Sequence, residues 1–304
     1  MVNLFDILRG KEGDNDYGKK PVIVQGITGK FGSDHTRQMI SYGTNIAAGV
    51  TPGKGGQKFD GVPIYNTVEE AVKATGSNIS ILFVPAKFFL GAAKEALNAG
   101  VKLLVAIPEH VPIRDVMTLL ELAKKNDAVI IGPNTPGIII PGIIKVGIMP
   151  ASAFKAGSIA VISKSGTLMY EVSHNVSSAS FGENITLGIG GDPINGTSLV
   201  EAFDMIKQDP NLQGIVVVGE IGGDAEELFA QHVIDTKFSK PIVAYIAGRA
   251  APKEKRMGHA GAIVYGNYGS AESKVAMFTK ANIPVAKRPV EIPMLLAGKL
   301  ETKV

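Results

Sequence analysis

The sequence predicts an α/β protein built from two doubly wound domains, each with a mainly parallel sheet. Three observations predict this class. Short apolar runs alternate with amphipathic stretches of helical length, several of these runs end in glycine, and the 304 residues include 36 glycines but only 6% aromatic residues. Strands that alternate with helices of about 10–15 residues are typical of parallel sheets. Numerous glycines suit the tight turns that join such strands to helices.

We expect the first domain to span residues 21–132. The apolar run 21–25 reads as its first strand, and residues 26–43 as a glycine-rich turn followed by an amphipathic helix. Further strands are expected at 45–50, 79–85, 103–107 and near residue 130, with helices between them. Residues 1–20 read as a separate N-terminal extension, a short helix and a polar lead-in, which we expect to be mobile rather than a docking arm.

The second domain is expected at residues 133–304. It begins in a stretch rich in proline and glycine, residues 132–142, and we interpret the region near residues 132–157 as the join between the domains. Its strands are expected at 158–163, 185–191, 214–223, 241–248 and, from a weaker signal, 283–286. The alternation with helices again predicts a doubly wound sheet.

Composition excludes several classes of protein. The net charge is +3, which argues against a general nucleic-acid binder, since such proteins carry a concentrated basic excess. The absence of cysteine excludes disulfides, thiolate metal sites and cysteine nucleophiles. No apolar run reaches the roughly 18–20 residues of a membrane-spanning helix, and no signal-peptide core is evident near Met1. We therefore expect a cytoplasmic location, with an organelle matrix as the alternative, and no membrane partner.

A glycine-rich turn, Gly26–Gly32, directly follows the first expected strand and opens a helix. Such a turn lets a phosphate approach the backbone at a helix N-terminus. The spacing is GxxGxxG, and the acidic residue that holds an NAD ribose about 20 positions further on is missing. Instead, Lys54 stands among glycines after the second strand. The pattern favours a phosphate-rich adenine nucleotide such as coenzyme A over NAD, with close helix–strand packing as the alternative.

His259 is the most notable of the five histidines. It lies in a segment that is basic on one side, through Lys253 and Arg256, and flanked by Gly258 and Gly261. Glu220 ends a strongly apolar strand, where sheets of this kind bind ligands. A carboxylate there could hold one imidazole nitrogen and leave the other as a nucleophile. The alternative for Glu220 is a role at the start of the next helix.

Ser163, Ser165 and Thr167 follow the first strand of the second domain and open a helix that continues through Tyr170. Their hydroxyl groups and the free N–H groups of the helix start would form a second anion site. Ordinary helix capping is an equally good interpretation of the same pattern. From the residues alone, the sequence therefore predicts a two-domain α/β protein with at least two phosphate sites.

Taken together and in order, the motifs resemble the α-subunit family of succinyl-CoA synthetase, within the NDP-forming acyl-CoA synthetases. The resemblance covers roughly residues 21–285 and is carried by QGITGKFG, TPGKGG, GPNTPG, SKSGTLMYE, GIGGDPI, GEIGG and KRMGHAGAI. It implies a Rossmann-like domain that binds CoA, followed by a flavodoxin-like ligase domain that carries a phosphohistidine.

The resemblance also assigns roles to residues. His259 would be the phosphorylated histidine and Glu220 its partner carboxylate. The CoA-binding residues would be Thr28, Gly29, Lys30, Phe31, Lys54, Ile107, Pro108 and Glu109. The residues around the phosphoryl group and the acid would be Ser163, Ser165, Gly166, Thr167 and Tyr170. No metal ligands are assigned in this chain.

The reaction implied by the resemblance is reversible acyl-CoA formation from an acid, CoA and a nucleoside triphosphate. The chain has no GxxxxGK[ST] loop, so we expect a β partner, as αβ or α2β2, that supplies the ATP or GTP site and Mg²⁺. Succinate is the first choice of a small dicarboxylic acid. Malate–CoA ligase, citryl-CoA synthetase and ADP-forming acetyl-CoA synthetase have similar α-type chains, and a non-catalytic CoA sensor or an NAD-dependent dehydrogenase are the remaining alternatives.

Two positions depart from the family pattern. Thr135 replaces the cysteine of the family's GPNCPG, so that thiol is not required here. Pro108 lies where the family has the threonine of ITE, and proline offers no N–H to a ligand.

Overall fold

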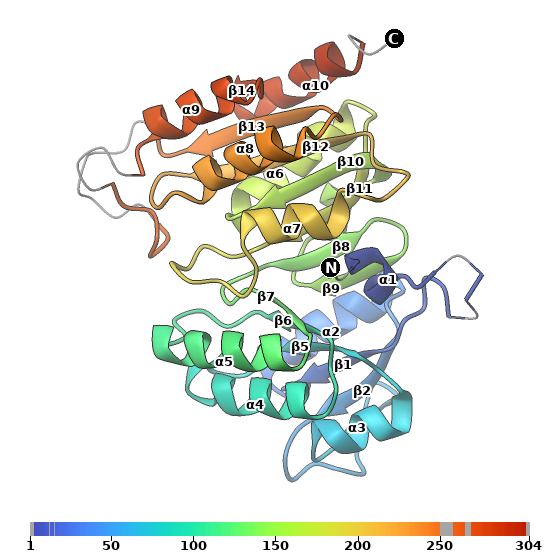
Figure 1. Ribbon diagram of the computed structural model, residues 1–304. Coiled ribbons are helices and arrows are strands. Elements are labelled where there is room, and N and C mark those ends of the chain that lie inside the picture. Colours follow the sequence, from blue (N-terminus) through green and yellow to red (C-terminus); the bar gives the residue numbers. More distant parts are fainter. Residues whose placement is uncertain (1–2, 12, 15, 250–257, 265–268, 302–304) are drawn as a thin grey trace. The chain divides into compact units, whose positions relative to one another are not determined.

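A computed structural model describes residues 3–11, 13–14, 16–249, 258–264 and 269–301 (Figure 1). The chain forms two compact units. The first contains residues 1–139, 143–149 and 194–197, and the second contains residues 140–142, 150–193 and 198–304. Within the described residues no helix is both long and apolar enough to cross a membrane.

The first unit is built on a seven-stranded sheet of order β3-β4-β2-β1-β5-β6-β7. The strands are β1 (Val22–Gln25), β2 (Ile46–Val50), β3 (Lys58–Phe59), β4 (Val62–Tyr65), β5 (Ile79–Leu82), β6 (Leu103–Ala106) and β7 (Val129–Ile131). All neighbours are parallel except β3, which pairs antiparallel with β4 at the edge. The six parallel strands have the Rossmann order 3-2-1-4-5-6.

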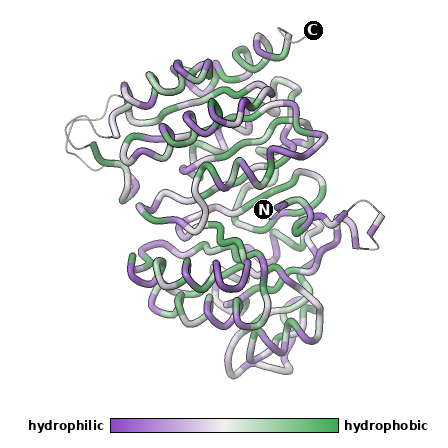
Figure 2. Tube along the Cα trace, in the orientation of Figure 1, coloured by the Kyte–Doolittle hydropathy of each residue, from purple (hydrophilic) through white to green (hydrophobic). Residues whose placement is uncertain are grey.

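Helices cover both faces of this sheet. They are α2 (Lys30–Tyr42), α3 (Val68–Thr75), α4 (Ala86–Asn98) and α5 (Ile113–Lys125), and the short helix α1 (Leu4–Leu8) precedes β1 in the chain. Helix α4 packs between α3 and α5, whereas α2 contacts β1 and β2 separately from them (Figure 1). The strands are apolar and the outward helix surfaces are more hydrophilic (Figure 2). This amphipathic pattern buries the apolar helix faces against the sheet.

Helix α1 of the N-terminal extension is packed, in contrast to the mobile extension expected from sequence. Leu4, Phe5 and Leu8 of α1 are each 0–1% exposed. The side chain of Asn3 caps the helix by accepting a hydrogen bond from the Phe5 N–H, and the Arg9 guanidinium lies over the Phe5 ring. Three large apolar side chains removed from water outweigh the polar lead-in that follows them.

The second sheet has the order β14-β13-β12-β10-β11-β8-β9. Its strands are β8 (Gly137–Ile140), β9 (Ile144–Gly147), β10 (Ala156–Ser163), β11 (Glu183–Gly188), β12 (Gly214–Glu220), β13 (Ile242–Ala247) and β14 (Val285–Ala286). Counted from β10, the order of the five strands β10 to β14 is the flavodoxin-like 2-1-3-4-5. The α/β fold expected from sequence, Rossmann-like and then flavodoxin-like, is therefore confirmed.

Helices lie on both faces of the second unit. They are α6 (Gly166–Ser178), α7 (Leu199–Ile206), α8 (Ala225–Thr236), α9 (Ala271–Lys280) and α10 (Ile292–Glu301), with short 3₁₀ turns at Ala151–Ala153 and Pro289–Glu291. Helix α8 packs between α7 and α9, and α6 packs against α10 (Figure 1). Strand β10, with α6 directly after it, lies at the centre of this sheet, between β12 and β11.

Strands β8 and β9 were not predicted from sequence. The stretch interpreted as a join contains two apolar runs on either side of Pro141 and Gly142, and all eight residues of the two strands are buried. Proline and glycine adjacent in the sequence mark a turn between strands as readily as a linker. Strands β3 and β4 were also missed, because β3 has only two residues and carries no periodic signal, and β4 contains Pro63, which argues against a strand.

Candidate active site

The loop between β10 and α6 starts the candidate site. The Ser163 hydroxyl donates a hydrogen bond to the Ser165 carbonyl, 2.7 Å, and accepts one from the Ser165 N–H, 3.1 Å. The Ser165 hydroxyl then caps α6 by accepting from the Leu168 N–H. The first N–H groups of a helix have no partner within the helix, so Gly166 and Thr167 offer donors to an anion at this end of α6.

Glu220 reaches the same edge of the sheet from β12. Strands β10 and β12 are parallel neighbours, with Ser163 aligned to Val218. Glu220 therefore lies two residues beyond that alignment, next to the start of α6. This is the point where the strand order reverses, the usual ligand position in sheets of this kind. The Glu220 side chain is only 7% exposed, so its charge acts in a poorly screened environment.

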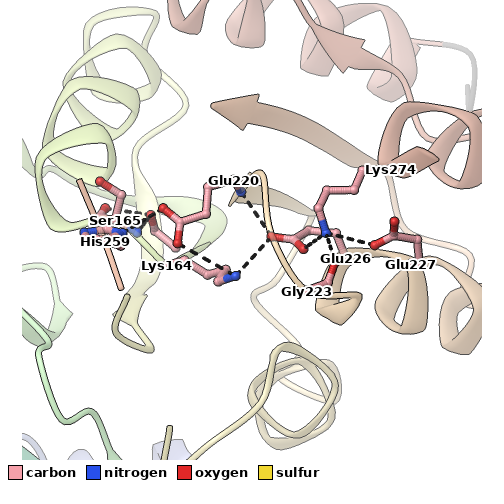
Figure 3. A network of polar contacts seen from close by, with 9 residues as sticks. Lys164, Ser165, Glu220, Gly223, Glu226, Glu227, His259 and Lys274 are labelled. Carbon is pink, nitrogen blue, oxygen red and sulfur yellow. Dashed lines mark hydrogen bonds and ion pairs between the residues drawn. The ribbon is translucent and has the colours of Figure 1, made fainter. Parts of the chain in front are cut away.

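His259 bonds directly to Glu220 (Figure 3). Its Nδ1 atom lies 2.7 Å from Oε2 of Glu220, and its side chain is 27% exposed. The bond occupies Nδ1 and leaves Nε2 as the second ring nitrogen. The hydrogen bond with Glu220 raises the pKa of His259 above 6.5, although burial of the ring opposes this. The carboxylate therefore favours the imidazolium form and holds the proton on Nδ1 when the ring is neutral.

Gly191 lies directly against the imidazole ring. A Cβ atom at this glycine would come within 2.4 Å of the His259 ring. Gly191 follows β11, whereas Glu220 ends β12, and β10 lies between these two strands. The imidazole therefore contacts Glu220 at the end of β12 and Gly191 in the loop after β11, the two strands that flank β10.

A second glycine lets the His259 segment approach the end of β12. A Cβ atom on Gly222 would come within 1.9 Å of the Gly261 carbonyl oxygen, and its backbone has a φ of +96°. Only glycine adopts that backbone without strain, and only glycine leaves the space. The GEIGG and GHAG motifs are thus two parts of one contact. Lys253 and Arg256, on the basic side of His259, lie outside the described residues.

A chain of buried charges extends away from Glu220, and sequence reasoning missed it (Figure 3). Lys164 Nζ lies 3.8 Å from Glu220 Oε1 and 3.6 Å from Glu226 Oε1. Glu226 accepts a hydrogen bond from the Glu220 N–H, 3.0 Å, and is paired with Lys274. A lysine inside SKSG and a glutamate early in a helix look like surface charges in the sequence, so only the fold shows that they meet.

Tyr170 lies one turn into α6. Burial raises its pKa to about 12, so its hydroxyl stays protonated and can donate a hydrogen bond. Its ring packs edge-on against Phe154, with the centroids 6.3 Å apart. Thr167, in the first turn, is exposed. The described residues contain no cluster of three or more His, Asp or Glu side chains that could hold a metal ion.

The glycine-rich turn of the first unit has the close approaches that its sequence suggested. Gly26 has a φ of +82°, and a Cβ atom on it would lie 2.9 Å from the Phe83 carbonyl oxygen. A Cβ atom on Gly32 would lie 2.3 Å from the Gly26 carbonyl oxygen. Gly29 precedes α2, and no described side chain caps that helix. The N–H groups at the start of α2 are therefore available to an anion.

The other residues expected to hold CoA follow strands of the same parallel sheet. The hydroxyls of Thr28 and Thr51 are 3.2 Å apart, which ties the first turn to the loop that carries Lys54. The described positions of Lys30, Phe31, Lys54 and Glu109 are exposed, Pro108 is half-buried and Ile107 is buried. The Pro108 carbonyl accepts a hydrogen bond from the Asn134 N–H, 2.9 Å. The carboxyl ends of β1, β2 and β6 thus bring these loops to one edge.

Thr135 occupies a buried turn. It is 3% exposed, and its hydroxyl accepts a hydrogen bond from the Gly137 N–H, 2.9 Å. A Cβ atom on Gly132 would come within 2.7 Å of the Thr135 methyl group. The departure from the family's cysteine therefore has a local structural role in this turn.

Two family models match the chain. Residues 18–110 match the CoA binding domain, and residues 162–282 match the CoA-ligase domain. The α subunit of succinate–CoA ligase [ADP-forming] from Aquifex aeolicus is 48% identical over 282 residues, which cover 92% of each chain. The corresponding subunit from Methanothermobacter thermautotrophicus is 50% identical over 270 residues, covering 89% of this chain and 91% of that one.

Solved structures share the fold at lower identity. ATP citrate lyase from Methanothrix soehngenii, in complex with citrate and coenzyme A, superposes with a TM-score of 0.86 at 23% identity, covering 98% of this chain and 50% of that one. The dinucleotide-forming acetyl-coenzyme A synthetase 1 of Ca. Korarchaeum cryptofilum gives 0.70 at 21% identity, covering 88% and 58%. At such identities the likeness concerns the fold alone. Together with the two domain matches, the close relatives show that this chain belongs to the family of succinate–CoA ligase α subunits, which are acid–thiol ligases.

Proposed function

We propose that this chain is the α subunit of a nucleoside-diphosphate-forming succinate–CoA ligase that works through a phosphohistidine at His259. The observation that carries the proposal is the His259–Glu220 hydrogen bond at the start of α6. It combines a nucleophile, a carboxylate that orients it and a helix N-terminus that favours negative charge. A non-catalytic CoA sensor would have no use for this combination.

In the first step, Nε2 of neutral His259 attacks the terminal phosphorus of a nucleoside triphosphate. The P–N bond forms, the bond to the bridging oxygen breaks, and the nucleoside diphosphate leaves. The ring becomes positively charged in the product, and Glu220 stabilises that charge through Nδ1–H. The N–H groups of Gly166 and Thr167, which follow the N-cap Ser165, can stabilise the negative charge on the phosphoryl oxygens.

In the second step, a carboxylate oxygen of the acid attacks the phosphorus and His259 leaves as neutral imidazole. The thiolate of CoA then attacks the acyl carbon, and inorganic phosphate leaves as the thioester forms. Each step is easier than direct condensation, which is the usual reason for a covalent intermediate. Tyr170, with a hydroxyl that stays protonated, is proposed as a hydrogen-bond donor to the acid.

CoA is proposed to bind at the carboxyl edge of the first sheet. Gly26, Gly29 and Gly32 leave the backbone open to a phosphate, and the start of α2 offers unpaired N–H groups. The residues proposed to contact CoA are Thr28, Gly29, Lys30, Phe31, Lys54, Ile107, Pro108 and Glu109. Pro108 can contribute only its carbonyl and ring, and that carbonyl already accepts from Asn134. Residues 21–132 and 133–304 are proposed as the CoA-binding and ligase domains.

A β subunit is proposed to complete the enzyme as αβ or α2β2. The relatives that match along nearly the whole chain are named α subunits. The β subunit would supply the site for ATP or GTP and for Mg²⁺, which neutralises the phosphates during transfer.

Reconstitution with a β subunit of the family tests this proposal. The complex, given succinate, CoA, ATP or GTP and Mg²⁺, should form succinyl-CoA with one diphosphate released per thioester, and His259→Ala should abolish the reaction. Malate and citrate in place of succinate distinguish the alternative acids. Formation of the thioester at full rate by the purified chain alone would contradict the need for a β subunit.

A further inference from the structure

A buried ion-pair chain lies behind the candidate site. It consists of Lys164, Glu226 and Lys274 (Figure 3). The side chains of Glu226 and Lys274 are both 0% exposed, and that of Lys164 is 10% exposed. Burying charges away from water is costly, and ion pairs in such places often contribute little net stability. A chain of three therefore calls for a reason other than stability.

The two carboxylate oxygens of Glu226 make different contacts. Its Oε2 atom accepts a hydrogen bond from Lys274 Nζ, which also donates to the Gly223 carbonyl and to Glu227. Its Oε1 atom accepts from the Glu220 N–H, 3.0 Å, and lies 3.6 Å from Lys164 Nζ. Burial opposes the charge of Lys274, but Glu226 and Glu227 outweigh it and raise its pKa. Lys274 therefore fixes Glu226 through Oε2, while Oε1 contacts the Glu220 N–H and Lys164 Nζ.

Lys164 is shared between two carboxylates. It lies 3.6 Å from Glu226 and 3.8 Å from Glu220. The Glu220 atom that it approaches, Oε1, is buried and has no hydrogen-bond partner among the described residues. The other oxygen of the same carboxylate bonds to His259. The position of Lys164 therefore decides how much of the Glu220 charge acts on the imidazole.

We propose that Glu226 and Lys164 are positioning residues that set the proton affinity of His259 in opposite directions. Glu226 draws Lys164 away from Glu220 and so leaves the Glu220 charge to His259. Lys164 partly neutralises that charge and so keeps the imidazole from being held as imidazolium. The balance keeps a useful fraction of the ring neutral while the carboxylate still orients it. The proposal rests on the proposed role of His259 for its consequence in the reaction, but not for its test.

Among the described residues, the charged groups that act on the imidazole come from three neighbouring strand ends. They are Glu220 at the end of β12, Lys164 directly after β10 and Asp192 in the loop after β11, while Glu226 contacts Glu220 from α8. Lys164 lowers the pKa of His259, and Glu220 and Asp192 raise it, in agreement with the geometry. Lys164 and Glu226 contact each other and Glu220, so changes at either residue reach the imidazole through Glu220.

The test is an NMR titration of the histidine ring signals in the full-length chain without nucleotide. His259→Ala identifies the His259 signal among the five histidines. In Glu226→Gln, Lys164 is left with Glu220 alone, so the pKa of His259 should fall relative to wild type. In Lys164→Met, the positive charge beside Glu220 is lost and the carboxylate acts on His259 alone, so the pKa of His259 should rise. Lys164→Arg keeps the positive charge, so the pKa of His259 in this variant should lie closer to that of wild type than it does in Lys164→Met.

Glu227→Gln is the matched control. It removes the same charge from the same lysine, one residue further along α8, but Glu227 bonds to Lys274 and Ser273 rather than to Lys164 or Glu220. It should leave the His259 titration as in wild type, whatever it does to thermal stability. If Glu226→Gln does not fold, the double change Glu226→Gln/Lys274→Met removes both buried charges, which proteins tolerate better than one unpaired charge. It should also lower the pKa of His259.

The directions of the shifts in the pKa of His259 test the proposal. Opposite shifts in Glu226→Gln and Lys164→Met, with Glu227→Gln unchanged, support the proposal. Shifts in the same direction, no shift in either variant, or an equal shift in Glu227→Gln overturn it. These results concern the unphosphorylated chain, so they stand apart from any failure of His259 to accept a phosphoryl group. If His259 is the residue that accepts the phosphoryl group, the pH at which the rate of phosphoryl transfer falls should shift with the pKa of His259 in each variant.

Discussion

Nδ1 of His259 lies 2.7 Å from Oε2 of Glu220, so one hydrogen bond fixes both the tautomer and the orientation of the imidazole. Glu220→Gln keeps a hydrogen-bond acceptor at this position but removes the charge that stabilises the phosphorylated ring. We expect phosphoryl transfer to His259 to slow by about 10²-fold or more, with CoA binding unchanged. Rapid-quench measurement of phosphorylation checks the first part, and calorimetric CoA binding checks the second. An unchanged transfer rate would show that the charge has no part in the step.

The same hydrogen bond predicts a pH profile. Transfer requires neutral His259, and Glu220 raises the pKa of its ring above 6.5. The rate should therefore be high above this raised pKa and fall as the pH is lowered through it. In Glu220→Gln the limb should move to lower pH, because the imidazolium loses its charged partner. The ratio of variant to wild-type rate across pH removes the β subunit's own pH dependence, and a constant ratio would contradict this account.

Gly191 tests the placement of the imidazole. A methyl group there would lie 2.4 Å from the His259 ring and displace it. We expect Gly191→Ala to reduce phosphorylation by about 10²-fold, since a shift of about 1 Å can cost that much. The control is Gly298→Ala, within α10, where a Cβ atom would meet nothing within 4 Å. That change should leave phosphorylation intact and raise stability by about 0.5–1 kcal/mol. Equal activity of the two variants would refute the placement.

A change at Lys54 should affect the binding of CoA but not the phosphorylation of His259. It is exposed in the loop that the Thr28–Thr51 contact ties to the glycine turn. We expect Lys54→Met to raise the KM for CoA about tenfold, the loss of one exposed charge contact of about 1.4 kcal/mol, and to leave phosphorylation of His259 unchanged. Lys58→Met, an exposed lysine on β3, is the control and should alter neither step. Loss of phosphorylation in Lys54→Met would place this lysine outside the CoA site.

Glu183 predicts a pH dependence of stability. It is 1% exposed, and burial raises its pKa to about 7, against hydrogen bonds from the Lys155 N–H and the Ser177 hydroxyl. The folded state therefore binds this proton more tightly than the unfolded state. The resulting stability is complete below pH 4.5 and is lost as the pH rises through about 7. Glu183→Gln should be more stable than wild type at pH 8 by on the order of 2 kcal/mol. The difference should shrink at pH 5, and denaturant unfolding at both pH values measures it. A less stable variant at pH 8 would mean that the ionised carboxylate is needed.

The fold was largely predictable because its signals are local. Apolar runs, glycines and helical periodicity predicted the alternation of strands and helices in both units and most of the parallel strands, but not β4. The same signals misled at β8 and β9, where Pro141 and Gly142 indicated a join but form the turn of a buried pair of strands. They were silent at β3, which has only two residues.

The site was less predictable because its contacts are long-range. The type and position of Glu220 suggested a partner for His259, and the two residues, 39 positions apart, do bond. Nothing in the sequence indicated that Glu226 meets Lys274, 48 positions further on, or that Gly191 leaves room for the imidazole. Such contacts depend on which loops the strand order brings together. The chemistry of a residue can be read locally, but its partners cannot.

The most direct measurement is phosphoryl transfer to this chain. The chain is combined with a β subunit of the family and given ATP or GTP labelled on the terminal phosphate, with Mg²⁺. The account predicts an acid-labile, base-stable label on this chain that is absent in His259→Ala and is discharged by succinate plus CoA. Failure of the chain to take up label beside an active β subunit, or label that persists in His259→Ala, would contradict it.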